Sequence, residues 1–189
     1  SIELDEQCGE DIWKGDDILG WMYENFNAVE KVQLKESGEK IEYDKVFLQS
    51  QIYTPQWVVK FLVDNTLGKQ YLEMYPDSRF MIDEETGKTK YLIANAPKQQ
   101  VRHPKENGVL DIRLIDPACG SGNFLIYAFS VFYDMYVDQM ENYGADFSRR
   151  DIPKLIVEHN LYGVDFEEGA VQITQIALFI KAMQLNGRR

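Results

Sequence analysis

Residues 114 to 125 read LIDPACGSGNFL, and this segment constrains the fold of the chain more than any other. An apolar run ends in Asp116, and Gly120 and Gly122 then stand one residue apart, just before a long apolar stretch. This order is typical of a strand joined to a helix by a turn whose backbone approaches a ligand closely. The turn could hold a nucleotide phosphate, a dinucleotide, another cofactor or no ligand at all.

The second half of the chain alternates between strand and helix patterns. The predicted elements are a strand at 109 to 115, a helix at 123 to 142, a short helix capped by Asp151 and ending at 157, a strand at 160 to 165 and a helix at 168 to 186. Such alternation predicts an α/β fold with parallel strands and helical crossovers. Ligands of such sheets bind at the carboxyl ends of the strands, which here are Asp116 and Asp165.

The first half of the chain predicts two helices and a hairpin. The apolar spacing of DDILGWMYENF predicts a helix from about 16 to 31, capped by Asp16 or Asp17, and the polar residues 36 to 40 predict a turn. A second helix is predicted to begin at Pro55 with Thr54 as its N-cap, and Gly68 either interrupts or caps it. Residues 79 to 93 predict a hairpin followed by a loop. The apolar stripe of the second helix is formed by Val58, Phe61, Leu62 and Leu67.

Composition excludes several classes of protein. A chain of 189 residues with 44% hydrophobic residues is large enough for one domain with a buried core, without an apolar run long enough to span a membrane. The acidic first residues differ from a signal peptide, so a cytoplasmic location is expected. Two cysteines and two histidines at unsuitable spacing argue against a metal site. The net charge of −11 argues against a chain that binds nucleic acid on its own.

The residues after the glycine turn discriminate between its possible ligands. Asn123 and Phe124 follow Gly122, where a phosphate-binding loop needs Lys and Ser or Thr. A dinucleotide turn matches poorly, because Asp165 lies 165 − 122 = 43 residues beyond Gly122 instead of about 20. S-adenosylmethionine fits better, because one acid suits its ammonium group, the glycines admit its tail and the other acid suits the ribose hydroxyls. Phe166 could stack on the purine.

Three segments of the sequence resemble one enzyme family. DPACGSGNFL resembles the first motif of S-adenosylmethionine-dependent adenine-N6 DNA methyltransferases, and NLYGVDFEEGAVQIT resembles their second. QIYTPQWVVKFLV resembles the segment that precedes both motifs in these enzymes. The resemblance is to type II restriction-modification methylases and the large methylases of BREX phage defence, and it covers residues 51 to 186. Residues 1 to 50 resemble the helical lead-in of that group.

The resemblance implies a role for each matching residue. Residues 53 to 55 would lie over the methionine end of the cofactor, with Thr54 near its carboxylate. Asp116 would reach the ammonium group, Asp165 would hold the ribose hydroxyls and Phe166 would pack on the adenine. The implied cofactor-binding set is Tyr53, Thr54, Pro55, Asp116, Ala118, Gly120, Gly122, Asn123, Phe124, Asp165 and Phe166.

The resemblance also implies a partial, truncated Rossmann-like methyltransferase fold. A helical N-terminal region would occupy residues 1 to 50, and part of an S-adenosylmethionine-binding domain would occupy 51 to 189. The family's catalytic motif, Asn or Asp followed by Pro-Pro and Tyr or Phe, is absent, because none of the six prolines is followed by another proline. We therefore expect a fragment with the cofactor half, no catalytic residues and no methylation activity alone.

Partner expectations follow from the same reasoning. The parent enzyme would bind double-stranded DNA through parts outside these residues, and uncovered sheet and helix surfaces favour self-association of the fragment. No membrane or metal partner is expected. The alternatives are a methyltransferase acting on RNA, protein or a small molecule, and a non-catalytic assembly module.

Several conspicuous residues have ordinary structural interpretations. Cys119 is expected to be a small buried residue of the turn, and His103 and His159 to lie on the surface or in loops. Lys98, Arg102 and Lys105 are expected in a solvated loop, with contact to a DNA backbone as the alternative. The residues expected in the core and at its margin, instead of stacking on bases, are Tyr127, Phe129, Phe132, Tyr133 and Tyr136.

Overall fold

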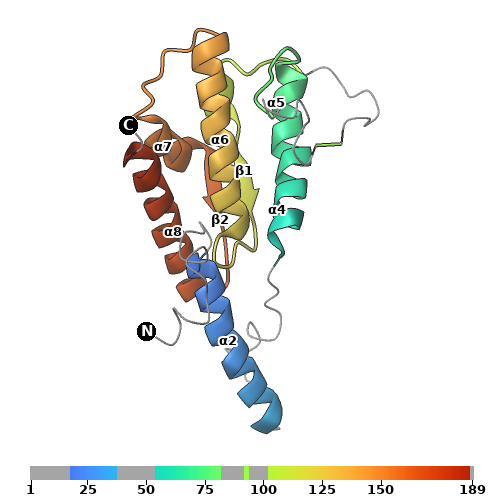
Figure 1. Cartoon of the computed structure of the whole chain (residues 1–189), viewed down its shortest axis with the longest axis vertical. Helices are drawn as coiled ribbons and strands as arrows, with labels where there is room; N and C mark the ends of the chain where they lie inside the picture. The colour runs from blue at the N-terminus through green and yellow to red at the C-terminus, as the bar shows by residue number, and fades with distance from the viewer. Residues whose placement is uncertain (1–17, 38–53, 82–91, 94–101, 188–189) are drawn as a thin grey trace.

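The computed structural model describes residues 18 to 37, 54 to 81, 92 and 93, and 102 to 187 of the chain. Within them, helices lie over and beside a two-stranded sheet (Figure 1). The N-terminal part contains α2 (Ile18–Ser37), α4 (Gln56–Val63), a π-helical turn (Asp64–Gly68) and α5 (Lys69–Met74). The C-terminal part contains a 3₁₀ turn (Gly108–Asp111), β1 (Leu114–Asp116), α6 (Asn123–Asn142), α7 (Ile152–Leu155), a second π-helical turn (Ile156–Asn160), β2 (Leu161–Gly163) and α8 (Glu168–Gly187).

The two strands are parallel, as the alternation of strand and helix patterns predicts. Leu114 pairs with Leu161, and Asp116 pairs with Gly163. The backbone contact continues past the strands, because Val164 N–H donates to the Asp116 carbonyl at 2.9 Å and Cys119 N–H donates to the Val164 carbonyl at 3.0 Å. The segments that follow the two strands are therefore joined at the carboxyl edge of the sheet.

The long helix α6 is the centre of the packing. It lies over the sheet, with α4 and α5 on one side and α7 and α8 on the other, while α2 lies at the end toward which the strands point (Figure 1). The predicted bounds of α6 are confirmed, and those of α8 are confirmed to within one residue. Phe129, Phe132 and Tyr136 on α6 are fully buried, and Tyr127 and Tyr133 pack at the margin of the core, as predicted.

The second predicted helix needs two corrections. The helix α4 begins at Gln56, and Pro55 occupies the cap position, so the prediction of Thr54 as N-cap is wrong. Its buried face matches the predicted stripe only in part, because Leu67 is buried and Val58 is partly buried. The π-helical turn that contains Gly68 interrupts the helix instead of ending it. Phe61 is 36% exposed and Leu62 is 42% exposed, and the residues that enter the core recur every four positions: Val59, Val63, Leu67 and Tyr71.

Other predicted boundaries also moved. The helix α2 runs to Ser37 instead of 31, while its predicted caps Asp16 and Asp17 lie outside the described residues. Asp151 does occupy the cap position of α7, but its side chain makes no capping hydrogen bond, and the helix continues as a π-helical turn to Asn160. Most of the predicted hairpin and the loop after it lies outside the described residues.

The predicted first strand, 109 to 115, is wrong for its first five residues, because β1 begins at Leu114. Residues 108 to 111 form a 3₁₀ turn, in which the Asp111 carboxylate accepts from Asn107 N–H at 3.0 Å. The buried amide side chains of Gln139 and Asn160, on other elements, form hydrogen bonds with the backbone of this segment. Asn160 Nδ2 donates to the carbonyls of Val109 at 2.9 Å and Ile112 at 2.7 Å. The backbone groups that a longer strand would use for pairing are therefore bonded to side chains.

Replacement of Asn160 by alanine is expected to destabilise the fold by about 3 kcal/mol. Asn160 is fully buried, and it also accepts a hydrogen bond from the Tyr136 hydroxyl at 2.9 Å. The variant would leave two buried carbonyls and one buried hydroxyl without this partner. Urea unfolding measures the change, and a loss below about 1 kcal/mol would contradict the assigned role. Glu158→Ala, at an exposed position of the same π-helical turn, is the control and should change stability by about 0.5 kcal/mol or less.

Apolar side chains remain exposed on several described surfaces, among them the sheet and α8. On the sheet, Ile115 and its register partner Tyr162 are exposed, and on α8 a stripe at helical spacing is exposed as well. The stripe consists of Ile176, Phe179, Ile180 and Met183. The predicted self-association stays a prediction. Among the described helices, none combines the length and apolar character needed to cross a membrane.

Candidate functional site

The segments that follow β1 and β2 come together at the carboxyl edge of the sheet. Asp116 ends β1 and Asp165 lies two residues beyond β2, on the two joined segments described above. The glycine turn between Asp116 and α6 lies against Asp165 as well, since Gly120 N–H donates to it. The sequence prediction that these two acids and the turn lie close together is therefore confirmed.

Asp116 carries a buried oxygen that the rest of the described structure leaves unpaired. Its Oδ1 atom accepts from Ala118 N–H at 3.2 Å, but its Oδ2 atom is buried without a hydrogen-bond partner among the described residues. Burial raises the pKa of the Asp116 carboxyl above its ordinary value, the Ala118 bond opposes this, and the nearby Asp165 charge adds to it. A positive group that reached Oδ2 would satisfy both the missing bond and the charge.

Asp165 is already engaged on both oxygens. Its Oδ2 atom accepts from Gly120 N–H at 2.7 Å, and its Oδ1 atom accepts from Glu167 N–H at 3.0 Å. A carboxylate has about four lone-pair positions, so each oxygen can accept a further bond from a ligand hydroxyl. Asp165 therefore shapes the glycine turn and retains acceptor capacity.

The two glycines of the turn have different surroundings. Both adopt left-handed backbone conformations, with φ of +51° at Gly120 and +88° at Gly122. A Cβ atom on Gly122 would lie 2.8 Å from Thr174 Cγ2, whereas a Cβ atom on Gly120 would meet nothing within 4 Å. Gly122 is thus required by packing, and Gly120 presents its Cα atom to open space beside Asp165.

The Thr54–Pro55 segment is attached to the glycine turn by Asn123. The Asn123 side chain donates to the Thr54 carbonyl at 2.8 Å and accepts from the Gln56 side chain. The structure therefore brings the predicted upstream segment to the start of α6, although 69 residues separate Thr54 from Asn123. Tyr53 lies outside the described residues.

The remaining predicted residues differ in how far they are exposed. Phe166 follows Asp165 and is 74% exposed, so its ring is accessible beside the acids. Ala118 is exposed, and Phe124 is partly buried against the core. Cys119 is buried, and burial raises the pKa of its thiol, which agrees with the predicted role as a small core residue.

The basic residues and histidines that the sequence singles out lie in exposed positions or outside the described residues. Arg102 pairs with Glu73 at 2.6 Å, Lys105 is exposed, and Lys98 lies outside the described residues. His103 and His159 are exposed, as predicted. Within the described ranges, no three potential metal ligands lie close enough to hold an ion.

Two residues of the site were missed by sequence reasoning. Thr174 is buried on α8 and donates through its hydroxyl to the Gly120 carbonyl at 2.8 Å, so Gly120 is held by Asp165 on one side and Thr174 on the other. Nothing in the local sequence marks Thr174, because its role depends on where α8 packs. Glu167 accepts from Gly169 N–H at 3.0 Å and from Ala170 N–H, and an acid just before a helix is a recognisable capping signal.

A comparison with protein families identifies a matching domain. Residues 91 to 189 match the model of the DNA-methyltransferase domain of MmeI, which is just over half of the chain. The matched residues include both strands, the glycine turn and the two acids.

Individual relatives match over a longer part of the chain. This chain is 31% identical to the adenine-specific methyltransferase BrxX of Escherichia coli O9:H4 (strain HS), over 96% of this chain and 14% of that protein. It is 32% identical to the adenine-specific methyltransferase PglX of Lacticaseibacillus casei (strain Zhang), over 91% of this chain and 14% of that protein. A putative type II restriction enzyme and methyltransferase of Methanocaldococcus jannaschii is 25% identical over 93% of this chain. The chain thus spans about one seventh of the length of these relatives.

Proposed function

Because this chain belongs to the family of the MmeI DNA-methyltransferase domain, we propose that it forms the cofactor-binding part of a DNA adenine-N6 methyltransferase. The cofactor is S-adenosylmethionine, which supplies an activated methyl group on a sulfonium. The parent enzyme transfers that group to adenine in restriction-modification or phage defence. The names of the relatives support the reaction class, and the site supports the cofactor.

The observation that carries the cofactor assignment is the unpaired Oδ2 atom of Asp116. A buried carboxylate oxygen without a partner is costly, and a ligand ammonium group would remove that cost. Beside it, Gly120 presents open space in which a Cβ atom would meet nothing within 4 Å. An ammonium group with a short chain of atoms attached fits this pair of features.

The nucleoside end of the cofactor is assigned to the segment after β2. Asp165 has acceptor capacity left for the two ribose hydroxyls, and the exposed ring of Phe166 stands next to it for the adenine. Thr54 and Pro55, held by Asn123, flank the methionine end. In this arrangement the chain binds and orients the methyl donor. It supplies the partial Rossmann-like half of the methyltransferase fold.

The acceptor base is assigned to other parts of the parent protein. An adenine must be flipped out of the duplex and its amino group must meet hydrogen-bond acceptors before it can attack the methyl group. The Pro-Pro motif that does this in the family does not occur in these 189 residues. We therefore expect cofactor binding without methyl transfer.

Calorimetric titration of the chain with S-adenosylmethionine tests the proposal. We expect saturable binding at one site, with no comparable binding of ATP or NAD. Absence of S-adenosylmethionine binding, or preference for ATP or NAD, would overturn the cofactor assignment. Methylation of unmethylated duplex DNA by the purified chain would overturn the division between donor and acceptor halves.

Asp165→Ala should weaken S-adenosylmethionine binding and also lower the melting temperature. The variant removes the acceptor for the ribose and, at the same time, the bonds to Gly120 N–H and Glu167 N–H. We expect a stability loss of about 1 to 3 kcal/mol from the two lost bonds. Asp146→Ala, at an exposed position, is the control and should change neither quantity. Unchanged binding in the Asp165 variant would contradict the site.

A further inference from the structure

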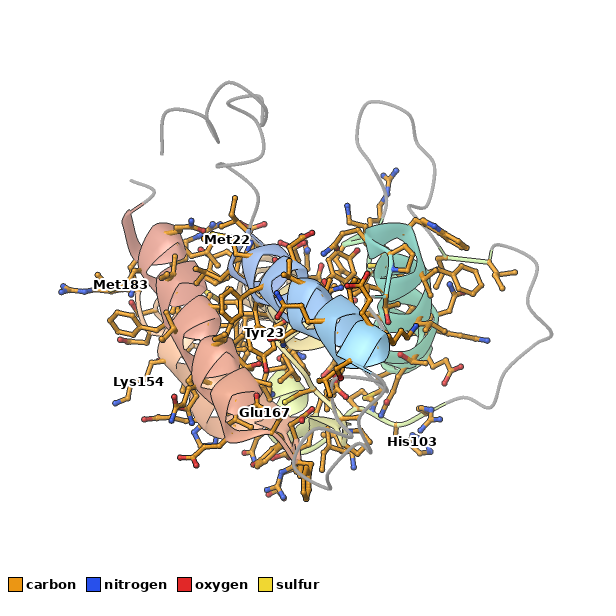
Figure 2. The ribbon with its side chains drawn as sticks, turned by 90° about the horizontal axis from the view of Figure 1, so that it is seen from below. Met22, Tyr23, His103, Lys154, Glu167 and Met183 are labelled. Atoms are coloured by element: carbon orange, nitrogen blue, oxygen red, sulfur yellow. The ribbon has the colours of Figure 1, made fainter. Side chains whose placement is uncertain are left out.

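The first half of α2 contacts both segments that build the candidate site. The Tyr23 hydroxyl donates to Glu167 Oε2 at 2.5 Å, and the two side chains meet between α2 and α8 (Figure 2). One turn earlier, Gly20 lies against the glycine turn, since a Cβ atom there would be 2.8 Å from Ser121 Oγ. The helix therefore contacts the loop after β1 and the loop after β2 at once.

Tyr23 is connected to the centre of the site through Glu167, which makes hydrogen bonds with both its side chain and its backbone. Its partner Glu167 donates its own N–H to Asp165 Oδ1 at 3.0 Å, and Asp165 Oδ2 accepts from Gly120 N–H at 2.7 Å. The Glu167 carboxylate also accepts from the first N–H groups of α8, at Gly169 and Ala170. The position of Asp165 and of its neighbour Phe166 therefore depends on where Glu167 is held.

The Tyr23 hydroxyl is suited to remain a donor. Burial raises its pKa to about 12, and the bond to Glu167 adds to the shift. At neutral pH the phenol is therefore protonated, and a hydroxyl bonded to a carboxylate is among the stronger hydrogen bonds in proteins. The residue also lies outside residues 91 to 189, the part that matches the methyltransferase domain.

We propose that α2 lines the cofactor site beside the loops after β1 and β2, and that Tyr23 is a positioning residue for the nucleoside end of the ligand. Through Glu167, it holds Asp165 and Phe166 in the arrangement that receives ribose and adenine. The inference rests on the proposed function. Because docking of α2 and binding of the ligand then favour the same arrangement, each strengthens the other by the same factor.

Replacement of Tyr23 by phenylalanine is the direct test, because it removes the hydroxyl and keeps the ring. We expect the Kd for S-adenosylmethionine to rise about 5- to 20-fold, which corresponds to part of the energy of one hydrogen bond to a charged group, because Tyr23 acts on the ligand only through Glu167. Tyr143→Phe, at the far end of α6, removes a hydroxyl in the same way and should leave the Kd unchanged. Val29→Ala, at an exposed position farther along α2, should leave it unchanged as well.

A cofactor fragment separates positioning from a general loss of structure. The compound 5′-methylthioadenosine has the nucleoside and lacks the amino-acid tail, so it uses Asp165 and Phe166 but not Asp116. Tyr23→Phe should weaken binding of the fragment by the same factor as S-adenosylmethionine, whereas Asp116→Asn should weaken only the complete cofactor. An equal affinity of the wild type and Tyr23→Phe for the fragment would overturn the inference.

Hydrogen exchange gives a readout that does not depend on the Tyr23 variant. We expect S-adenosylmethionine to slow amide exchange in residues 18 to 27 of α2, and this protection should be reduced in Gly20→Val, where the side chain collides with Ser121. Amide exchange in α2 that is the same with and without S-adenosylmethionine would overturn the inference. If the wild type fails to bind S-adenosylmethionine at all, the proposed function fails instead, so the two failures are distinguishable.

Discussion

Replacing Asp116 by asparagine is expected to weaken S-adenosylmethionine binding by about 10- to 100-fold while the unliganded protein keeps its stability. The amide preserves the size of the side chain and the oxygen that accepts from Ala118 N–H. It removes the negative charge and places an amino group where the unpaired Oδ2 atom now lies. The ammonium of the ligand then loses its ionic partner.

The stability half of this prediction follows from the sign of the pKa shift. Burial raises the pKa of the Asp116 carboxyl, so between its ordinary value and the raised value the folded chain binds more protons than the unfolded chain. The free energy of unfolding therefore falls as the pH rises through that interval, and the loss is complete once the pH is above the raised pKa. Asparagine has no such loss, so the melting temperature of the variant should equal or exceed that of the wild type.

The same shift predicts the pH dependence of cofactor binding. The cationic ammonium needs the ionised carboxylate, so affinity should decrease as the pH falls toward the raised pKa of Asp116, at a higher pH than an ordinary aspartate would give. Titrations between pH 4 and 8 would show the decrease. An Asp116→Asn variant that binds S-adenosylmethionine as tightly as the wild type, or one that melts well below it, would contradict the assigned role.

The two acids of the site thus have different roles, and their substitutions should change different measured quantities. Asp165 organises the backbone through Gly120 and Glu167, so its removal changes folding and binding together. Asp116 has one oxygen that no described residue uses, so its removal affects mainly the ligand. A functional carboxylate is most clearly recognised where the fold itself would be better without the charge.

The part of this architecture that the sequence predicts is the part with local causes. The apolar period of residues 123 to 142 and the glycines before it predict α6 and its turn, because both depend on neighbours in the chain. The 3₁₀ turn at 108 to 111 escapes prediction, because side chains from Gln139 and Asn160 supply the hydrogen bonds that a strand would have made. The apolar residues that predict a strand at 109 to 112 are therefore found in a 3₁₀ turn and the residue after it.

The contacts that hold the site together were also beyond prediction. Tyr23 lies 144 residues from Glu167, and Thr174 lies 54 residues from Gly120. Each residue is unremarkable in its own helix, and only the packing of α2 and α8 against the sheet end gives it a partner. The residues expected to touch the ligand follow a motif, whereas those that position them follow the tertiary structure.

The two glycines of the turn should respond differently to substitution by alanine: Gly122→Ala should lose more stability, and Gly120→Ala should lose cofactor binding. In Gly122→Ala, the left-handed backbone costs about 1 to 2 kcal/mol and the collision with Thr174 adds about 1 to 3 kcal/mol, so stability falls most. In Gly120→Ala, only the backbone cost applies, because the new methyl group points into open space. That space is where we place the methionine tail, so S-adenosylmethionine binding should fall by about tenfold or more.

Gly144 offers a matched control for this comparison. It has a φ of +69°, a Cβ atom there would also meet nothing within 4 Å, and it lies just beyond the opposite end of α6 from the turn. Gly144→Ala should therefore lose about the same stability as Gly120→Ala and keep its affinity for the cofactor. Urea unfolding and calorimetry on the three variants separate strain, packing and ligand contact. Equal affinities in Gly120→Ala and Gly144→Ala would show that the ligand does not lie against the turn, because only a molecule in that space can distinguish the two methyl groups.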